Sequence, residues 1–170
     1  MMRTIVLGIL LVFVHILEST LFEYIRIGGI GPNFMIMIIV SFALLRGSKE
    51  GMLIGLVAGL LYDISFGLHI GPTMITYMLI GYTCGKFNKN FYRENFIIPF
   101  ICTLISSLFY SMVNIMALVL RGTLNFGYFI KSVMIPELIY TITLSLIVYQ
   151  IAYSINEKIE ERERDSRNMF

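Results

Sequence analysis

The stretch of sequence that decides the fold is Gly51-Met52-Leu53-Ile54-Gly55-Leu56-Val57-Ala58-Gly59-Leu60-Leu61-Tyr62-Asp63. It holds no charged residue before Asp63, and its glycines recur every four residues, which places Gly51, Gly55 and Gly59 on one face of a helix. Small residues on one face allow two membrane helices to approach closely. The pattern therefore predicts an apolar helix that packs tightly against another helix along its glycine face.

Asp63 continues the glycine row by a further four residues. Two interpretations of this acid stay open. In the first, Asp63 caps the turn that follows the helix. In the second, it points into the helix bundle and binds something, because an acid inside a membrane segment is costly and is a functional candidate by default.

The composition of the whole chain points the same way. Of its 170 residues, 57% are hydrophobic and 14% are charged, and the mean hydropathy is +0.80. Soluble domains are roughly 45–50% apolar and about 25% charged. A membrane-spanning helix takes about 20 residues, so the spans use up most of the chain. We therefore predict an all-α polytopic membrane protein, a six-helix bundle.

The uncharged runs give the bounds of the expected elements. Six helices are predicted to form a transmembrane domain over residues 1–153, and a charged cytoplasmic tail follows at 154–170; the helices cover about 4–24, 33–45, 51–66, 72–86, 95–120 and 132–153. The first is expected to be an uncleaved anchor, because no alanine precedes Ala43 to form a signal cleavage site. Glycines and a proline at 67–72 predict a hairpin between the third and fourth helices.

The distribution of Lys and Arg predicts the orientation. With the N-terminus inside, ten of these residues fall on the cytoplasmic side and only three outside, namely Arg26, Arg121 and Lys131. Cytoplasmic loops of membrane proteins carry an excess of Lys and Arg. Both termini are therefore expected in the cytoplasm. The net charge of +2 is too small for a nucleic-acid-binding surface.

The acidic residues are biased towards the opposite, outer half of the bundle. Together with a histidine they are expected to form an outer-half polar patch of His15, Glu18, Glu23 and Glu137, with Asp63 at a similar depth. This patch is either a structural ring of salt bridges or a site for a ligand or for a segment of a partner. The rotation of the helices decides between the two, and the sequence does not fix that rotation.

Groups that membrane enzymes need are missing from the sequence. Asp63 and Asp165 are the two aspartates, and Asp165 lies in the tail, so an intramembrane aspartate pair cannot form. His15 and His69 lack the spacing of a zinc protease, and there is no GxSxG motif. Cys84 and Cys102 lie in apolar runs and form no metal motif. We expect no enzymatic activity, no cofactor and no metal.

Several of these motifs occur in an order that resembles a known family. Gly31-Pro32-Asn33-Phe34 opens a helix, the stretch from Gly51 to Ile64 follows, and then come Gly67, Gly71, Tyr77 and Gly81. This order is similar to that of MreD, the rod-shape-determining membrane protein family of bacteria. The resemblance assigns a structural or interaction role, by helix packing or partner binding, to Pro32, Asn33, Gly55, Gly59, Asp63, Gly67 and Gly71, and the glycine row adds Gly51.

The resemblance also implies a function. MreD proteins are similar in fold to the substrate-binding subunits of energy-coupling-factor transporters, and they are non-catalytic parts of the cell-elongation machinery in the cytoplasmic membrane. The implied partner is MreC, a single-span protein, and through it MreB, a RodA-type glycosyltransferase and a class B penicillin-binding protein. The main hypothesis is thus a scaffold that holds a partner helix against the glycine groove and supports lateral peptidoglycan synthesis. The alternative is a small-molecule-binding subunit of an energy-coupling-factor-type vitamin transporter.

Overall fold

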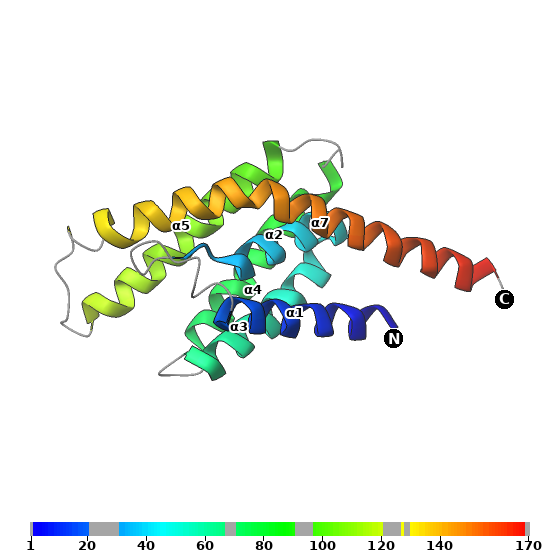
Figure 1. The fold of residues 1–170 in the computed structure, drawn as a ribbon, viewed down its shortest axis with the longest axis horizontal. Coiled ribbons are helices and arrows are strands. Elements are labelled where there is room, and N and C mark those ends of the chain that lie inside the picture. The colour runs from blue at the N-terminus through cyan, green and yellow to red at the C-terminus, as the bar shows by residue number, and fades with distance from the viewer. Residues whose placement is uncertain are drawn as a thin grey trace.

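The computed structural model describes residues 2–20, 31–66, 71–90, 97–120, 127 and 130–168. Within these ranges every regular element is a helix, which confirms the predicted all-α class. Its six α-helices are α1 (Met2–Thr20), α2 (Phe34–Arg46), α3 (Ser48–Phe66), α4 (Pro72–Lys86), α5 (Ile97–Leu120) and α7 (Ile135–Asn168). A 3₁₀ turn, η2 (Phe87–Asn90), follows α4, and a π-helical turn, η3 (Ile130–Met134), precedes α7. The helix α1 begins and α7 ends towards the same end of the bundle (Figure 1).

Helix α2 is the centre of the fold. Every residue from Met35 to Leu45 is buried, and α2 packs against α3, α4, α5, α7 and α1. A helix that is hydrophobic on all sides must be enclosed by other helices or by lipid, and here the other helices enclose it (Figure 1). Its 13 residues give a length of about 20 Å. This is well short of the hydrocarbon core, which is about 30 Å thick.

The helices α3 and α4 form an antiparallel pair with the most extensive contact in the molecule. A single residue, Gly47, separates α2 from α3, and its positive φ of 92° is a conformation that glycine adopts without strain. Asn88 supports this turn, because its Nδ2 donates a hydrogen bond to the carbonyl of Leu44 at 2.6 Å. The predicted hairpin at 67–72 lies partly outside the described residues, which resume at Gly71.

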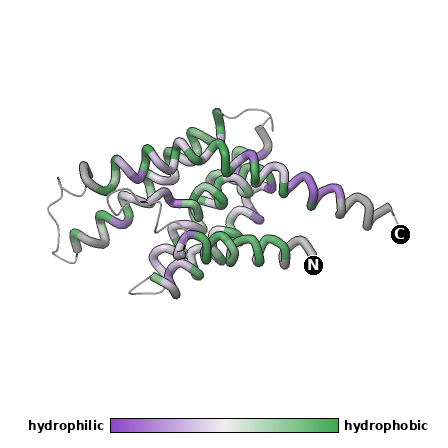
Figure 2. The backbone as a smooth tube through the Cα atoms, in the orientation of Figure 1, coloured by the Kyte–Doolittle hydropathy of each residue, from purple (hydrophilic) through white to green (hydrophobic). Residues whose placement is uncertain are grey.

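The helices α5 and α7 pack against each other and against α2. Within the described residues, only these two are long and apolar enough to cross a membrane, over Ile97–Met116 and Ile135–Glu161. The apolar stretches of α1 and α2 are shorter, at Val6–Thr20 and Phe34–Arg46. Figure 2 shows hydrophobic residues along most helices of the bundle and hydrophilic residues towards the far end of α7. For the other four helices, the expected membrane spans rest on the sequence argument alone.

Helix α7 differs most from its expected bounds. The wide π-helical turn ends at Met134, two residues before Pro136. Proline has no N–H group, and its ring clashes with the carbonyl four residues earlier, which explains why a regular α-helix does not begin until Ile135. At its other end α7 continues to Asn168, so the part of the expected tail that is described is a direct extension of the helix. The favourable i,i+4 order of Glu160 with Arg164 is consistent with that extension.

Candidate functional site

The glycine row of α3 faces α4 of the same chain. A Cβ atom added to Gly55 would collide with the backbone of Tyr77, and one added to Gly59 would collide with the backbone of Met74. A Cβ added to Gly51 would lie 2.5 Å from the carbonyl oxygen of Gly81. The two helices therefore touch backbone to backbone. The hypothesis that this groove holds a partner's helix needs revision, because α4 already fills the groove.

Asp63 is buried, with 2% of its surface exposed, and it lies at the hairpin end of α3. Its Oδ2 atom accepts hydrogen bonds from the backbone N–H groups of Gly71 at 2.8 Å and Met74 at 3.1 Å. Gly71, the N-cap residue of α4, has a φ of 130° and has no side chain that could cap the helix. Asp63 thus satisfies amides at the N-terminus of α4 and places a negative charge beside the positive end of that helix. The structure therefore contains the capping contact, which is the first of the two interpretations of Asp63. Gly67 lies outside the described residues.

Asn33 joins three helices at a buried point, which we call the Asn33 junction (Asn33, Tyr77 and Thr141). It is the N-cap of α2, and its Oδ1 accepts a hydrogen bond from the N–H of Ile36 at 3.0 Å. Its Nδ2 donates to the hydroxyl of Tyr77 on α4 at 3.2 Å, and its backbone N–H donates to Thr141 Oγ1 on α7 at 3.1 Å. Pro32, which immediately precedes the cap, is also buried.

The surroundings of this junction are polar and aromatic. The rings of Tyr62 and Tyr77 have centroids 6.1 Å apart, and those of Tyr77 and Tyr110 are 5.3 Å apart. Glu137, half-buried at the start of α7, interacts with the Asn33 side chain. Glu18 of α1 is half-buried and lies within electrostatic range of Tyr77. Two of the predicted outer-half acids therefore face the junction.

The other members of the expected outer-half patch lie elsewhere. His15 Nε2 and Ser65 Oγ are hydrogen-bonded at 2.7 Å, and the His15 ring meets Phe66 edge-on at 5.5 Å, so His15 fastens α1 to the end of α3. Asp63 belongs to the hairpin. Glu23 lies outside the described residues. Glu18 and Glu137 therefore lie near the Asn33 junction, whereas His15 and Asp63 make separate contacts.

A second buried polar cluster lies at the opposite end of α2, and the sequence analysis did not identify it. Arg46, whose side chain is 5% exposed, donates from Nε to Asn156 Oδ1 on α7 at 2.6 Å. Its Nη1 contacts Glu50 Oε2 at 3.3 Å, and Asn156 Nδ2 donates to Glu160 Oε1 at 2.9 Å. The helix α2 is thus tied to α7 at both ends, through Thr141 and through Asn156. In the sequence, this cluster is marked only by Asn156, an asparagine at the start of the charged tail.

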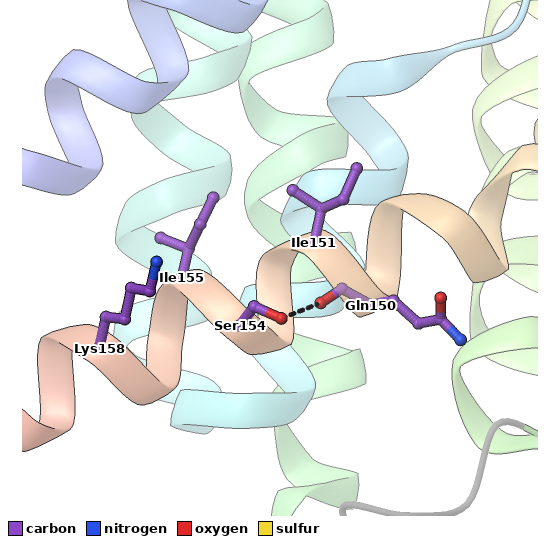
Figure 3. A pocket seen from close by; sticks show the side chains of 5 residues that line it. All are labelled: Gln150, Ile151, Ser154, Ile155 and Lys158. Atoms are coloured by element: carbon purple, nitrogen blue, oxygen red, sulfur yellow. Dashed lines mark hydrogen bonds between the residues drawn. The ribbon is translucent and has the colours of Figure 1, made fainter.

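The surface of α7 has one shallow hollow of about 270 Å³ near this end. Figure 3 shows its lining side chains, all from α7, with the Ser154 hydroxyl donating to the Gln150 carbonyl at 3.1 Å. The remaining lining residues are Ile151, Ile155 and Lys158. Because a single helix supplies them all, the hollow offers no converging polar groups of the kind that orient a ligand. Among the described residues, no three His, Cys, Asp or Glu side chains gather to hold a metal.

The fold and these contacts define a small all-helical membrane protein in which several buried polar side chains join the helices. The family model described as rod shape-determining protein MreD matches residues 1–158, and the chain belongs to this family of membrane proteins. It is also similar to the rod shape-determining protein MreD of Bacillus subtilis (strain 168), with 22% identity over 120 residues, which cover 70% of each chain. No solved structure matches the chain. The similarity to energy-coupling-factor subunits therefore has no support from a structural match.

Proposed function

We propose that this chain is a non-catalytic scaffold of the bacterial cell-elongation complex. Its family membership gives it a role in determining rod shape, and the family is one of structural proteins. We further propose that it holds an MreC-like single-span protein and so supports lateral peptidoglycan synthesis, with MreB, a RodA-type glycosyltransferase and a class B penicillin-binding protein as indirect partners. It lies in the cytoplasmic membrane with six spans and both termini cytoplasmic.

The observation that carries the scaffold proposal is the direction of the side chains. The glycines of α3 and buried polar side chains such as Tyr77 and Asn156 contact other helices of this chain, whereas many exposed side chains are large and apolar. On α1, the exposed apolar side chains are Val6, Ile9, Val12, Phe13 and Ile16. A protein built in this way meets lipids and partner helices through its outward faces.

Gly8 marks one outward face for a partner helix. A Cβ added to Gly8 would meet nothing within 4 Å, whereas Cβ atoms on Gly51, Gly55, Gly59, Gly81 and Gly85 would all lie within 3.0 Å of another backbone. A glycine inside a helix costs roughly 0.5–1 kcal/mol relative to alanine. A partner helix packed against Gly8 could approach the α1 backbone closely, as α4 approaches the backbone of α3 at its glycines.

The test is co-purification with an MreC-like protein from the same organism. We expect Gly8→Leu to reduce the recovered partner strongly, because the added side chain holds the two helices apart. Ile105→Trp on the exposed face of α5 is the matched control, since Ile105 is 58% exposed and lies on another helix. Wild-type recovery with Gly8→Leu would place the partner elsewhere, and a loss with Ile105→Trp would place it on α5.

The alternative of a vitamin-transporter subunit receives no support from the comparisons, and the groups of the Asn33 junction already bond to one another. A genome neighbourhood with an ATPase and a transmembrane-coupling subunit would favour it. A neighbouring gene for a protein with one helix, a coiled coil and a β-rich domain would favour the scaffold.

A further inference from the structure

Two outward faces of the molecule differ in hydrophobic length. On α5, exposed apolar side chains extend from Ile97 to Val119, which is about 33 Å at 1.5 Å per residue. On α3, they extend from Leu53 to Phe66, which is about 20 Å by the same rise. The paired helix α4 is similarly short, because it runs only from Pro72 to Lys86, a rise of about 21 Å.

The described part of the short face has charged groups at one end and the buried Asp63 carboxylate near the other. Lys49 and Lys86 lie near one end of the α3–α4 pair, and the Asp63–Gly71 contact lies at the other. The pair cannot slide or splay to lengthen this face, because its glycines hold the two backbones in direct contact. Tilting would shorten its span across the bilayer further. A hydrocarbon core of about 30 Å matches α5 and exceeds the α3–α4 face by about 9 Å.

We propose that the α3–α4 face is covered by a locally thinned bilayer and selects phospholipids with short acyl chains, whereas the α5 face accepts lipids of ordinary length. A bilayer adapts to a short hydrophobic surface by thinning, at a cost of fractions of a kcal/mol per Å of mismatch, and short-chain lipids lower that cost. Most exposed side chains on the short face are apolar, including Val57, Ile75 and Leu79, and the hydroxyls of Ser65 and Thr83 are the exceptions among its described residues from 53 to 83. This inference rests on the six-span placement proposed above.

The chain has no tryptophan, so one introduced tryptophan reports on one face. Leu79→Trp places it on α4, where Leu79 is 42% exposed, and Ile105→Trp places it on α5, where Ile105 is 58% exposed. Each variant of the full chain is reconstituted into phosphatidylcholine vesicles that mix brominated dioleoyl lipid with unbrominated lipid of dimyristoleoyl or dioleoyl chains. Bromine quenches tryptophan on contact, so the quenching gives the relative affinity of each face for each chain length.

We expect the Leu79→Trp face to bind the dimyristoleoyl lipid roughly two-fold more tightly than the dioleoyl lipid. The Ile105→Trp face should not prefer the shorter lipid. Val57→Trp, on α3 in the same face, should reproduce the result of Leu79→Trp and guards against a local effect of one substitution. Leu79→Trp and Val57→Trp should keep the thermal stability of the wild type, because the replaced side chains are exposed.

The same chain-length preference on both faces would overturn the thinned bilayer and leave the six-span placement intact. Absence of quenching at both Leu79→Trp and Val57→Trp, with strong quenching at Ile105→Trp, would remove the α3–α4 face from the lipid altogether and would overturn the placement as well. Neither outcome depends on the MreC-like partner, which is absent from the vesicles.

Discussion

The carboxamide of Asn33 and the hydroxyl of Tyr77 are bonded to each other in the middle of the bundle, at 3.2 Å from Nδ2 to the hydroxyl and 3.3 Å from the hydroxyl to Oδ1. Tyr77 is fully buried and Asn33 is 6% exposed. The pair links the start of the central helix to α4, 44 residues away in the chain. The position of α2 is thereby fixed relative to the glycine-packed pair that surrounds it.

Removing one partner of this pair should destabilise the protein. Tyr77→Phe leaves the Asn33 amide without the hydroxyl, and an unsatisfied buried polar group costs about 1–3 kcal/mol. Asn33→Ala loses the same bond and also the N-cap of α2, which adds about 1 kcal/mol. Thermal unfolding of the purified protein in detergent should rank the variants as wild type, then Tyr77→Phe, then Asn33→Ala.

The double variant tests the contact itself. If the two side chains act as a unit, Tyr77→Phe should destabilise an Asn33→Ala background much less than it destabilises the wild type, because the bond is already lost. Equal effects of Tyr77→Phe in the two backgrounds would contradict the importance of this bond.

Substitution by alanine should distinguish a glycine that lies in a helix contact from one that lies on an open face. In Gly55→Ala the new Cβ would collide with the α4 backbone, which cannot move aside as a flexible side chain could, so we expect loss of folded protein or a fall of several kcal/mol. Gly8→Ala meets open space and should raise the stability of isolated chain by about 0.5–1 kcal/mol. Expression yield and thermal unfolding measure both. A well-folded Gly55→Ala variant would mean that α3 and α4 are further apart than described.

The sequence predicted the all-helical class and the glycine face, because both are recorded in local patterns of hydrophobicity and spacing. It could not identify the neighbour of that face, since any helix with a small surface would serve. It also left Asp63 undecided, because a carboxylate at a helix end can turn either to the next loop or into the bundle. Arg46 was counted only as a marker of the cytoplasmic side. Its partner Asn156 is 110 residues away, and no local pattern connects the two.

Asp63 offers a test of capping against ligand binding. Asp63→Ala removes the acceptor for the amides of Gly71 and Met74, and loss of such a cap costs about 0.5–2 kcal/mol. Asp63→Asn keeps an acceptor oxygen and removes only the charge beside the helix end, so its cost should be smaller, typically about 0.3–1 kcal/mol. Thermal unfolding distinguishes the two. A capping role also predicts that Asp63→Asn still supports rod shape in cells, whereas a charge-dependent binding role predicts rounded cells at normal protein levels.

The contact between Arg46 and Asn156 should control how firmly α7 is held at the C-terminal end of α2. In Asn156→Leu the buried guanidinium keeps Glu50 but loses its bond to α7, and a hydrogen bond to a charged group contributes about 1.5–3 kcal/mol. Arg46→Lys should be nearly as harmful, because an ammonium cannot reproduce the separate contacts made by Nε and Nη1. Hydrogen exchange should then quicken in α7 around Asn156 and leave the α3–α4 pair protected, since the glycine contacts are untouched.

Ser154→Ala, on the exposed side of the same turn, is the control and should change neither stability nor exchange in the bundle. Unchanged protection of α7 in Asn156→Leu would show that apolar packing alone holds this helix in place.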